Sequence, residues 1–315
     1  MTLQQLRYIV AITETRSITA AAARLFVSQP SLTNAVRHLE EEMNLSLFVR
    51  SSRGVEPSSE GKTFLSYARQ VLEQANLLEE KYKNTQRQSP RFSVSCQHYS
   101  FAVEAFVDVI RRFDASDYDF TLRETQTHEI IEDVSRLTSE IGVLYLSSRN
   151  EEIIRKLLHR NRLRFQLLFE AKPHVFLRRG HPLAGREQIR LEELQSYPYF
   201  SFEQGEYNSF YFSEEILSAA DSPKNIKVRD RATLFSLLIG LDGYTVSSGV
   251  ISETLDGSGI IARPLVSDEI MRIGAVTQKD MILSRYGKCY LEALHEHIKN
   301  PAAPPLTGKQ PDPAI

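Results

Sequence analysis

Hydrophobic residues recur with two different periods along the chain, and the change falls near residue 90. Before it, apolar residues return every three or four positions, which is typical of helices with one buried face. After it, short apolar runs alternate with helical patterns, which is typical of a sheet with helices packed on it. At 315 residues the chain is long enough for two or three compact units. We therefore expect an α/β protein with an all-α N-terminal part.

The first helical pattern covers Leu3–Thr15, and the segment Ile18–Phe48 predicts two short helices joined by a tight turn. The first short helix has an alanine-rich face, made by Ala20, Ala21 and Ala23. Alanine side chains are small, so we expect another helix to approach this face closely.

The second short helix is expected to begin at Ser28, a residue type that caps helix N-termini, with Pro30 tolerated in its first turn. Its apolar residues, from Leu32 to Met43, share one face, and short or forked hydrogen-bonding side chains occupy the other. A helix with these two sides, packed on a small-residue partner, is what a helix-turn-helix needs to enter the major groove. Amphipathic helix pairs also occur in many other helical proteins, so the pattern alone leaves DNA binding open.

Two extended pieces, Leu47–Arg50 and Val55–Pro57, follow and predict a β-hairpin, or wing, with Gly54 in its turn. Arg50 and Arg53 flank the tip, where positive charge favours contact with phosphates or the minor groove. Exposed arginines in a hairpin are often only solvated, but the adjacent helices favour DNA contact.

A long helix then begins after Ser58 or Ser59, with Glu60 in its first turn. Apolar residues along it step by four and three, which is a heptad seam. We expect this seam to pair with a second copy, because a small domain has too little surface to bury it; packing on the downstream region is the alternative. A dimer would read two half-sites related by a two-fold axis. The seam consists of Phe64, Ala68, Val71, Ala75, Leu78 and Tyr82.

Residues 1–65 resemble the N-terminal domain of the LysR-type transcriptional regulators, most specifically in AAARLFVSQPSL, LEEEMNLSLFVR and EGKTFL. The resemblance implies a winged helix-turn-helix in which Gln29 and Asn34 read adenine edges and Arg37 reaches guanine or phosphate. Arg50 and Arg53 would hold backbone phosphates. The full set expected to line the groove is Gln29, Pro30, Ser31, Thr33, Asn34 and Arg37.

Beyond the linker the order of elements, with SEIGVLYL, FLRRGHPLAG and GYTVSSGVI, resembles the effector-binding region of the same family. There two α/β lobes are joined by two crossing strands, as in periplasmic binding proteins. The resemblance implies a winged helix-turn-helix over 1–58, a linker helix and hinge over 59–91, and an effector domain over 92–300. Its first lobe would cover 92–163 and 268–300, and its second lobe 164–267. Residues 301–315, with five prolines, are expected to be a disordered tail.

The expected strands lie at 92–96, 120–124, 141–146, 165–169, 174–177, 199–202, 226–228, 244–247 and 272–277. The expected helices lie at 101–113, 130–137, 191–196, 212–220, 234–239 and 285–298.

Small ligands of two-lobed α/β folds lie beyond the carboxyl ends of strands, near helix N-termini. This rule selects residues that are mostly hydroxyl or amide donors, which suits an amino acid, a sulfur metabolite or a small carboxylate. The family resemblance singles out Gln97, Ser100 and Thr127, although Cys96–Tyr99 is bulkier than the Ser/Thr-rich turn common in the family. Each residue could alternatively serve only to cap its helix. The expected effector contacts are Ser95, Gln97, His98, Tyr99, Ser100, Thr127, Ser201, Phe202 and Ser247.

Composition narrows the function further. The net charge is −2, while residues 1–90 hold 11 lysines and arginines against nine glutamates, which permits DNA binding without arguing for it. Cys96 and Cys289 form no disulfide framework or zinc motif. A thiol near a helix N-terminus could sense oxidants, but a small buried side chain is the simpler interpretation of Cys96.

The sequence shows no signal-peptide pattern and no run of ~18 apolar residues, so we expect a cytoplasmic protein. It also lacks G-x-S-x-G, H-E-x-x-H, P-loop and dinucleotide motifs, so we expect neither an enzyme nor a cofactor or metal.

We therefore expect a sequence-specific DNA-binding transcriptional regulator controlled by a small-molecule effector. The resemblance implies an interrupted palindrome in double-stranded DNA, a homodimer or homotetramer, and leaves RNA polymerase open as a partner. Two alternatives remain: a small-molecule binding protein whose N-terminal helices serve only oligomerisation, and an enzyme built on the α/β lobes.

Overall fold

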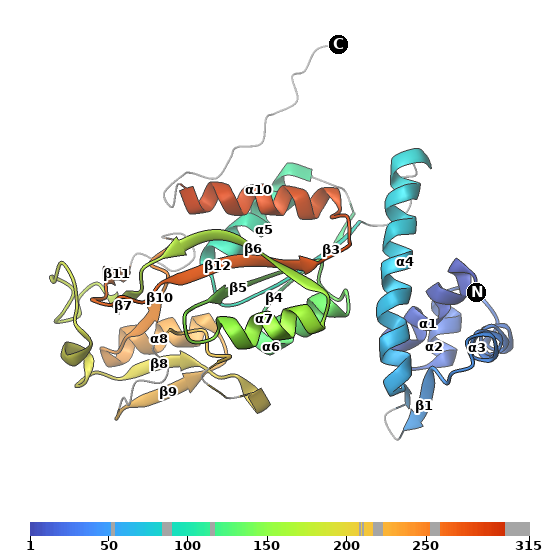
Figure 1. The fold of residues 1–315 in the computed structure, drawn as a ribbon, viewed down its shortest axis with the longest axis horizontal. Helices are drawn as coiled ribbons and strands as arrows, with labels where there is room; N and C mark the ends of the chain where they lie inside the picture. The colour runs from blue at the N-terminus through green and yellow to red at the C-terminus, as the bar shows by residue number, and fades with distance from the viewer. Residues whose placement is uncertain are drawn as a thin grey trace, which may run out of the picture. The chain divides into compact units, whose positions relative to one another are not determined.

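The computed structural model describes residues 1–51, 54–83, 90–113, 117–207, 209, 211–216, 223–252 and 259–299. The chain forms two compact units, Met1–Gln88 and Ser89–Ile315, which we call the N-terminal and C-terminal units (Figure 1). Arg53 and the expected tail at 301–315 lie outside the described residues. Within the described part, no helix is both long and apolar enough to cross a bilayer.

Four helices and one hairpin make up the described N-terminal unit. They are α1 (Leu3–Thr15), α2 (Ile18–Arg24), α3 (Gln29–Met43), β1 (Phe48–Ser51), β2 (Gly54–Pro57) and α4 (Ser59–Lys83). The expected helix pair and wing are therefore present.

Local sequence explains where these helices begin. Ser17 and Ser28 have extended backbones, and their side chains accept hydrogen bonds from backbone N–H groups in the first turns of α2 and α3. Thr2 and Gln5 form a capping box at the start of α1. Pro30 lies in the first turn of α3, where its missing N–H costs no helical hydrogen bond.

The core of the N-terminal unit joins all four helices. Leu6, Ile9 and Ile12 of α1 pack with Leu32 and Leu39 of α3, and these five side chains are almost fully buried. The alanines that let α2 approach are Ala21 and Ala22, whereas Ala20 and Ala23 are exposed. The expected alanine face was therefore correct for Ala21 and wrong for Ala20 and Ala23, and it omitted Ala22.

The wing docks on the turn between α1 and α2. Gly54 has a positive φ of 109°, and a Cβ atom built there would lie 2.5 Å from the carbonyl oxygen of Arg16. The N–H of Val55 donates to that same oxygen at 3.0 Å. Only glycine combines this backbone angle with so close an approach.

The beginning of the α4 seam lies inside the N-terminal unit. Ala68 is buried in the common core, together with Leu65, and Phe64 packs partly against it. Further along α4, Val71 and Leu78 are exposed, Leu78 to 62%. The expectation that the whole seam faces a second copy was wrong for Phe64 and Ala68, because α1 supplies apolar surface that covers them.

The C-terminal unit is an α/β structure with two lobes. The first lobe has a five-stranded sheet in the order β4-β3-β5-β12-β6, and in Figure 1 α5 and α10 lie on one face and α6 and α7 on the other. Strands β3, β4 and β5 are parallel, and β12 runs antiparallel to both β5 and β6. Its elements are β3 (Arg91–Cys96), α5 (Ser100–Phe113), β4 (Asp119–Glu124), α6 (Thr127–Ser135), β5 (Ile141–Leu146), α7 (Glu151–Arg160), β6 (Leu163–Ala171), β12 (Met271–Gln278) and α10 (Arg285–Lys299).

The second lobe holds a three-stranded sheet, in the order β10-β7-β11, and a parallel pair, β8 and β9. Its elements are β7 (His174–Arg178), a 3₁₀ turn (Leu191–Leu194), β8 (Tyr199–Phe202), a second 3₁₀ turn (Gly205–Tyr207), β9 (Asn225–Val228), α8 (Arg231–Leu241), β10 (Thr245–Ser247) and β11 (Ile260–Pro264). One hydrophobic cluster contains buried residues of both lobes, among them Tyr145 of the first and Tyr199 of the second.

Several sequence expectations for this unit need correction. Helix α7 and strand β11 were not anticipated, and α6 begins at Thr127 rather than at residue 130. Of the helix expected over 212–220, residues 212–216 form turns and bends, and 217–220 lie outside the described residues. Strand β6 pairs with β12 along its length, so residues 164–171 belong to the sheet of the first lobe, and the expected border at 163/164 lies too early.

Candidate DNA-binding face and effector site

Helix α3 separates its apolar and polar residues onto opposite sides. Leu32, Val36 and Leu39 are buried in the core of the N-terminal unit. All six residues predicted to line the groove are exposed: Gln29, Pro30, Ser31, Thr33, Asn34 and Arg37. The helical period therefore collects the predicted recognition residues on one solvent-facing side.

Local contacts restrain part of this face. The Thr33 hydroxyl donates to the backbone carbonyl of Gln29 at 2.9 Å, and the Gln29 amide lies 3.4 Å from the same hydroxyl. Arg37 lies 3.6 Å from Glu41 on the next turn, but both side chains are exposed, so this ion pair is weak and leaves Arg37 available. The side chain of Arg50 lies outside the described residues, as Arg53 does.

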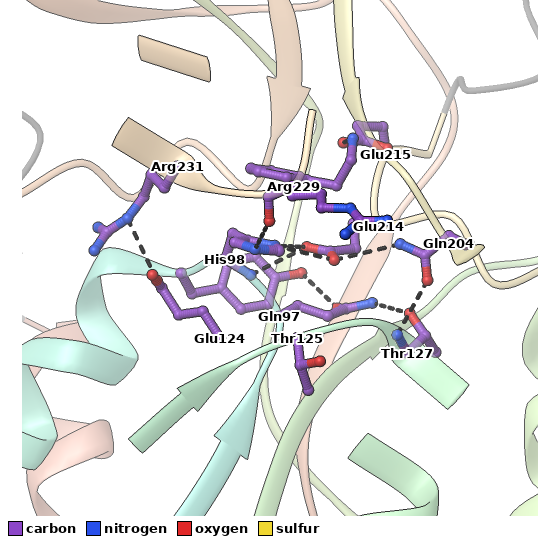
Figure 2. A network of polar contacts seen from close by, with 12 residues as sticks. Gln97, His98, Glu124, Thr125, Thr127, Gln204, Glu214, Glu215, Arg229 and Arg231 are labelled. Atoms are coloured by element: carbon purple, nitrogen blue, oxygen red, sulfur yellow. Dashed lines mark hydrogen bonds and ion pairs between the residues drawn. The ribbon is translucent and has the colours of Figure 1, made fainter. Parts of the chain in front are cut away.

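The second candidate site lies between the two lobes (Figure 2). The first lobe contributes residues that follow the carboxyl ends of β3 and β4, as the strand-end rule predicts: Gln97, His98, Thr125 and Thr127. The second lobe contributes residues that follow β8 and β9: Gln204, Glu214, Glu215, Arg229 and Arg231.

His98 and Glu214 form a buried ion pair across the lobes, with side chains that are 4% and 6% exposed. The Glu214 carboxylate accepts from the His98 backbone N–H at 3.0 Å and lies 2.8 Å from the ring Nδ1. The ring Nε2 lies 3.1 Å from the carbonyl oxygen of Arg229. Both ring nitrogens thus face acceptors, which requires the protonated, cationic imidazole.

The electrostatics of His98 agree with this protonation state. Burial opposes the positive charge, but the charge and hydrogen bond of Glu214, helped by the charge of Glu124, outweigh burial and raise the pKa of His98. The ring also stacks on Phe202 of β8, with ring centres 3.7 Å apart and planes 6° from parallel. His98 is therefore held by three segments of the second lobe.

A second set of contacts joins the lobes through amides. The buried Gln97 side chain donates to the Thr127 hydroxyl at 2.7 Å and accepts from the Tyr145 N–H at 3.0 Å. The Thr127 N–H, at the start of α6, donates to the Gln204 side-chain oxygen at 3.1 Å. The backbone donors of His98 and Thr127 in the first lobe are therefore satisfied by side-chain oxygens of the second lobe.

Glu215 has a different environment from its neighbour Glu214. It is 3% exposed, and one of its carboxyl oxygens accepts from the Phe202 N–H at 2.8 Å. The other, Oε2, is buried and has no hydrogen-bond partner among the described residues. Burial, reinforced by the Glu214 charge, raises the pKa of Glu215 to about 8, so this carboxyl is protonated at neutral pH.

The remaining predicted effector residues have three different environments. Tyr99 is buried beside the cluster, where its hydroxyl donates to the Gln97 side chain at 3.2 Å. Ser95 instead donates to Asp133 within the first lobe at 2.6 Å, and Ser201 donates to Asn225 within the second at 3.4 Å. Ser100 is buried at the first residue of α5, and Ser247 is partly buried at the end of β10.

Apart from Phe202, sequence reasoning missed the second-lobe residues that complete the site. Arg229 and Arg231 follow the expected strand at 226–228, so the same strand-end rule could have selected them. Glu214 and Glu215 were hidden inside an expected helix. Arg231 lies 3.3 Å from Glu124, which places one more ion pair between the lobes.

The two cysteines do not join this chemistry. Cys96 is fully buried, and burial, with the charges of Glu124 and Glu214, raises the pKa of its thiol, which disfavours the reactive thiolate. Among the residues that the structure describes, no group of three or more histidine, cysteine, aspartate or glutamate side chains could hold a metal ion.

A helix-turn-helix with a wing, followed by a two-lobed α/β unit with a polar site between the lobes, defines a ligand-responsive DNA-binding regulator. Residues 3–62 match the family model of the bacterial regulatory helix-turn-helix proteins of the lysR family, and residues 85–299 match the LysR substrate binding domain. The chain therefore belongs to the LysR family of transcriptional regulators, with a DNA-binding domain and an effector-binding domain.

Curated relatives are themselves transcriptional regulators. The chain is 31% identical over 205 residues to the uncharacterized regulator YnfL of Escherichia coli K12, a match that spans 64% of this chain and 65% of that protein. It is 26% identical over 254 residues to AlsR of Bacillus subtilis, a match that spans 79% and 78%.

Solved structures share the fold at low sequence identity. A full-length variant of OxyR from Pseudomonas aeruginosa matches with a TM-score of 0.66 at 20% identity, over 94% of this chain and 98% of that one. Full-length CbnR complexed with its target DNA matches with a TM-score of 0.55 at 19% identity, over 96% and 100%.

Proposed function

We propose that two copies of α3 read the two halves of an interrupted palindrome in double-stranded DNA. The observation that carries this proposal is the single exposed face of α3, on which the six predicted residues gather opposite a fully buried face. Gln29 and Asn34 can pair with adenine edges, and Arg37 can reach guanine or a phosphate. Arg50 and Arg53 of the wing contact phosphates and contribute affinity without sequence preference.

The test replaces one base-reading residue and one phosphate-binding residue. Gln29→Ala should reduce discrimination between operator and random DNA, whereas Arg53→Ala should weaken binding to both and lower the salt slope by about one. Gln188→Ala, the same change at an exposed position of the C-terminal unit, is the control. Unchanged specificity in Gln29→Ala would show that a different face reads the bases.

We propose further that α4 pairs two copies through the part of its seam that its own unit leaves uncovered. Val71 and Leu78 are exposed apolar residues seven positions apart, and Ala75 lies between them on the same heptad stripe. The resulting homodimer, or a tetramer built from it, works in the cytoplasm and regulates transcription without catalysis.

The interlobe site is proposed as the place where a small effector binds. Gln97, His98, Thr127 and Phe202 meet there from both lobes, so a ligand that replaces their contacts changes how the lobes are held. An effector regulates only if it binds one arrangement better than the other. We propose an amino acid, a sulfur metabolite or a small carboxylate.

Thermal-shift screening of these compound classes tests the effector site, because a ligand of the folded state raises the melting temperature. Thr127→Val should abolish the shift, since it removes the hydroxyl that accepts from Gln97. Thr138→Val, at an exposed position outside the cluster, should keep it. A shift that survives Thr127→Val would place the effector elsewhere.

A further inference from the structure

The charges at the interlobe site are already balanced within the protein. His98 pairs with Glu214 and Arg231 with Glu124, and these side chains are largely shielded from solvent. An anionic ligand therefore finds each of these two cations engaged by a carboxylate of the chain.

The backbone donors that would hold an anionic group are also engaged. Glu214 accepts from the N–H of His98, and Gln204 accepts from the N–H of Thr127 at the start of α6. Figure 2 shows both second-lobe side chains reaching across to these first-lobe segments. The carboxylate of Glu214 thus already accepts the hydrogen bond that the His98 N–H would donate to an anionic ligand.

Two buried oxygen atoms of the second lobe, in contrast, lack a hydrogen-bond partner among the described residues. Glu215 Oε2 and the Tyr199 hydroxyl are buried without a hydrogen-bond partner in the described structure, in residues that are only 3% and 2% exposed. Buried polar atoms of native proteins are nearly always hydrogen-bonded, so two such oxygens in one lobe call for an explanation. A ligand with several N–H donors would satisfy them.

These oxygens belong to a polar interior shared by both lobes. The charge of Glu215 contributes to the raised pKa values of Tyr99 and Tyr145 in the first lobe and of Tyr199 in the second, after burial as the main cause. Glu215 is also tied to β8 through the N–H of Phe202, the residue that stacks on His98. The unsatisfied carboxyl oxygen is therefore an internal part of the interlobe site.

We infer that the effector carries a protonated amine, and that Glu215, with Glu214 beside it and the Tyr199 hydroxyl, is the group that selects it. Within the compound classes proposed above, this inference favours amino acids and other amines and disfavours carboxylates that lack nitrogen. It rests on the proposed effector site and narrows the ligand class of that site. An ammonium group offers up to three donors to these oxygens, and the surrounding tyrosine rings suit a cation.

The experiment compares ligand pairs that differ only in the amine. The full-length protein is screened by thermal shift with the twenty L-amino acids, n-butylamine and putrescine, and with nitrogen-free partners such as propionate for alanine and 3-hydroxypropionate for serine. We expect at least one amine to raise the melting temperature while its nitrogen-free partner does not.

Two variants test whether Glu215 and Tyr199 bind the amine. Glu215→Gln keeps the shape of the side chain but cannot ionise when the amine binds. It should weaken binding of the active amine by at least about tenfold in titration calorimetry. Tyr199→Phe removes only the unsatisfied hydroxyl and should weaken it less. Glu206→Gln, an exposed carboxylate of the same lobe, should bind like wild type. Circular dichroism confirms that each variant folds.

The outcomes separate this inference from the proposed effector site. If nitrogen-free carboxylates stabilise the protein as well as their amine partners, and Thr127→Val abolishes that effect, the effector site stands and the amine inference fails. If an amine binds Glu215→Gln as tightly as wild type, the assignment to Glu215 fails. If no compound raises the melting temperature, both fail.

Discussion

Glu215 should make the folded protein less stable as the pH rises, and Glu215→Gln should remove that dependence. The buried carboxyl has a pKa of about 8, against an ordinary value of 4.5. Between these two values the folded chain keeps a proton that the unfolded chain has released. The free energy of unfolding therefore falls with rising pH through this window, by about 1.4 kcal/mol per pH unit.

The expected magnitude follows from the width of that window. At pH 7 the protonated Glu215 costs about 3 kcal/mol relative to a group that never ionises. Glutamine at this position is always neutral but adds one buried amide N–H without a partner, which costs about 1–3 kcal/mol at every pH. The free energy of unfolding of Glu215→Gln, relative to that of wild type, should therefore rise by about 3 kcal/mol between pH 5 and pH 7.5. This rise does not depend on how the two proteins compare at pH 5.

Urea unfolding followed by circular dichroism, repeated at half-unit steps of pH, measures this difference. For a unit of this size, about 3 kcal/mol corresponds to roughly 6–12 °C in the melting temperature. Glu206→Gln, at an exposed carboxylate, should run parallel to wild type across the range. A constant difference between Glu215→Gln and wild type from pH 5 to pH 7.5 would refute the reasoning, because Glu215 would then ionise normally in the folded state.

Three further outcomes are expected. Glu214→Ala leaves the buried His98 cation without its partner and should destabilise the C-terminal unit by about 3–5 kcal/mol below pH 6.5. The loss should be smaller at higher pH, because His98 can then lose its proton. Urea titrations at pH 6 and pH 8.5 measure the two losses, and equal values would contradict the prediction. Leu78→Asp should shift the protein toward monomer in sedimentation velocity without lowering its melting temperature below that of monomeric wild type; an unchanged dimer would move the interface away from α4. Leu39→Ala should lower the stability of the N-terminal unit by about 2–5 kcal/mol, whereas Ala23→Gly, at an exposed position of α2, should cost no more than about 1 kcal/mol. Chemical denaturation measures both losses, and comparable values would argue against the core described above.

The helix-turn-helix could be predicted from sequence because its determinants are local. Ser17 and Ser28 cap the helices they precede, and the period of Leu32, Val36 and Leu39 fixes which side of α3 is buried. The same locality limits the prediction at the seam. The heptad spacing correctly identifies an apolar stripe on α4, but it does not tell which neighbour covers each turn, and α1 covers Ala68.

The interlobe site could be predicted in its first-lobe half, but in its second-lobe half the prediction identified only Phe202, which stacks on His98. Gln97, His98 and Thr127 follow parallel strands, and strand ends converge by the topology of the sheet. Their partners depend on contacts between distant segments: His98 and Glu214 are 116 positions apart, and Glu214 lies in turns without a periodic pattern. A local pattern carries no signal for such a pair.

The position of Glu215 also explains why a regulator would keep a group that destabilises it. Burial and the charge of Glu214 keep Glu215 neutral, although the cationic His98 acts in the opposite direction. An ammonium group reverses that balance: it lowers the pKa of Glu215, and the proton that the folded chain retained is released. The ligand thereby removes a cost that the protein bears only in its absence. Because the neighbouring Glu214 holds His98 of the first lobe, this change acts beside a contact between the lobes. A difference in free energy between two arrangements, switched by one compound, is the quantity that an effector must supply to regulate DNA binding.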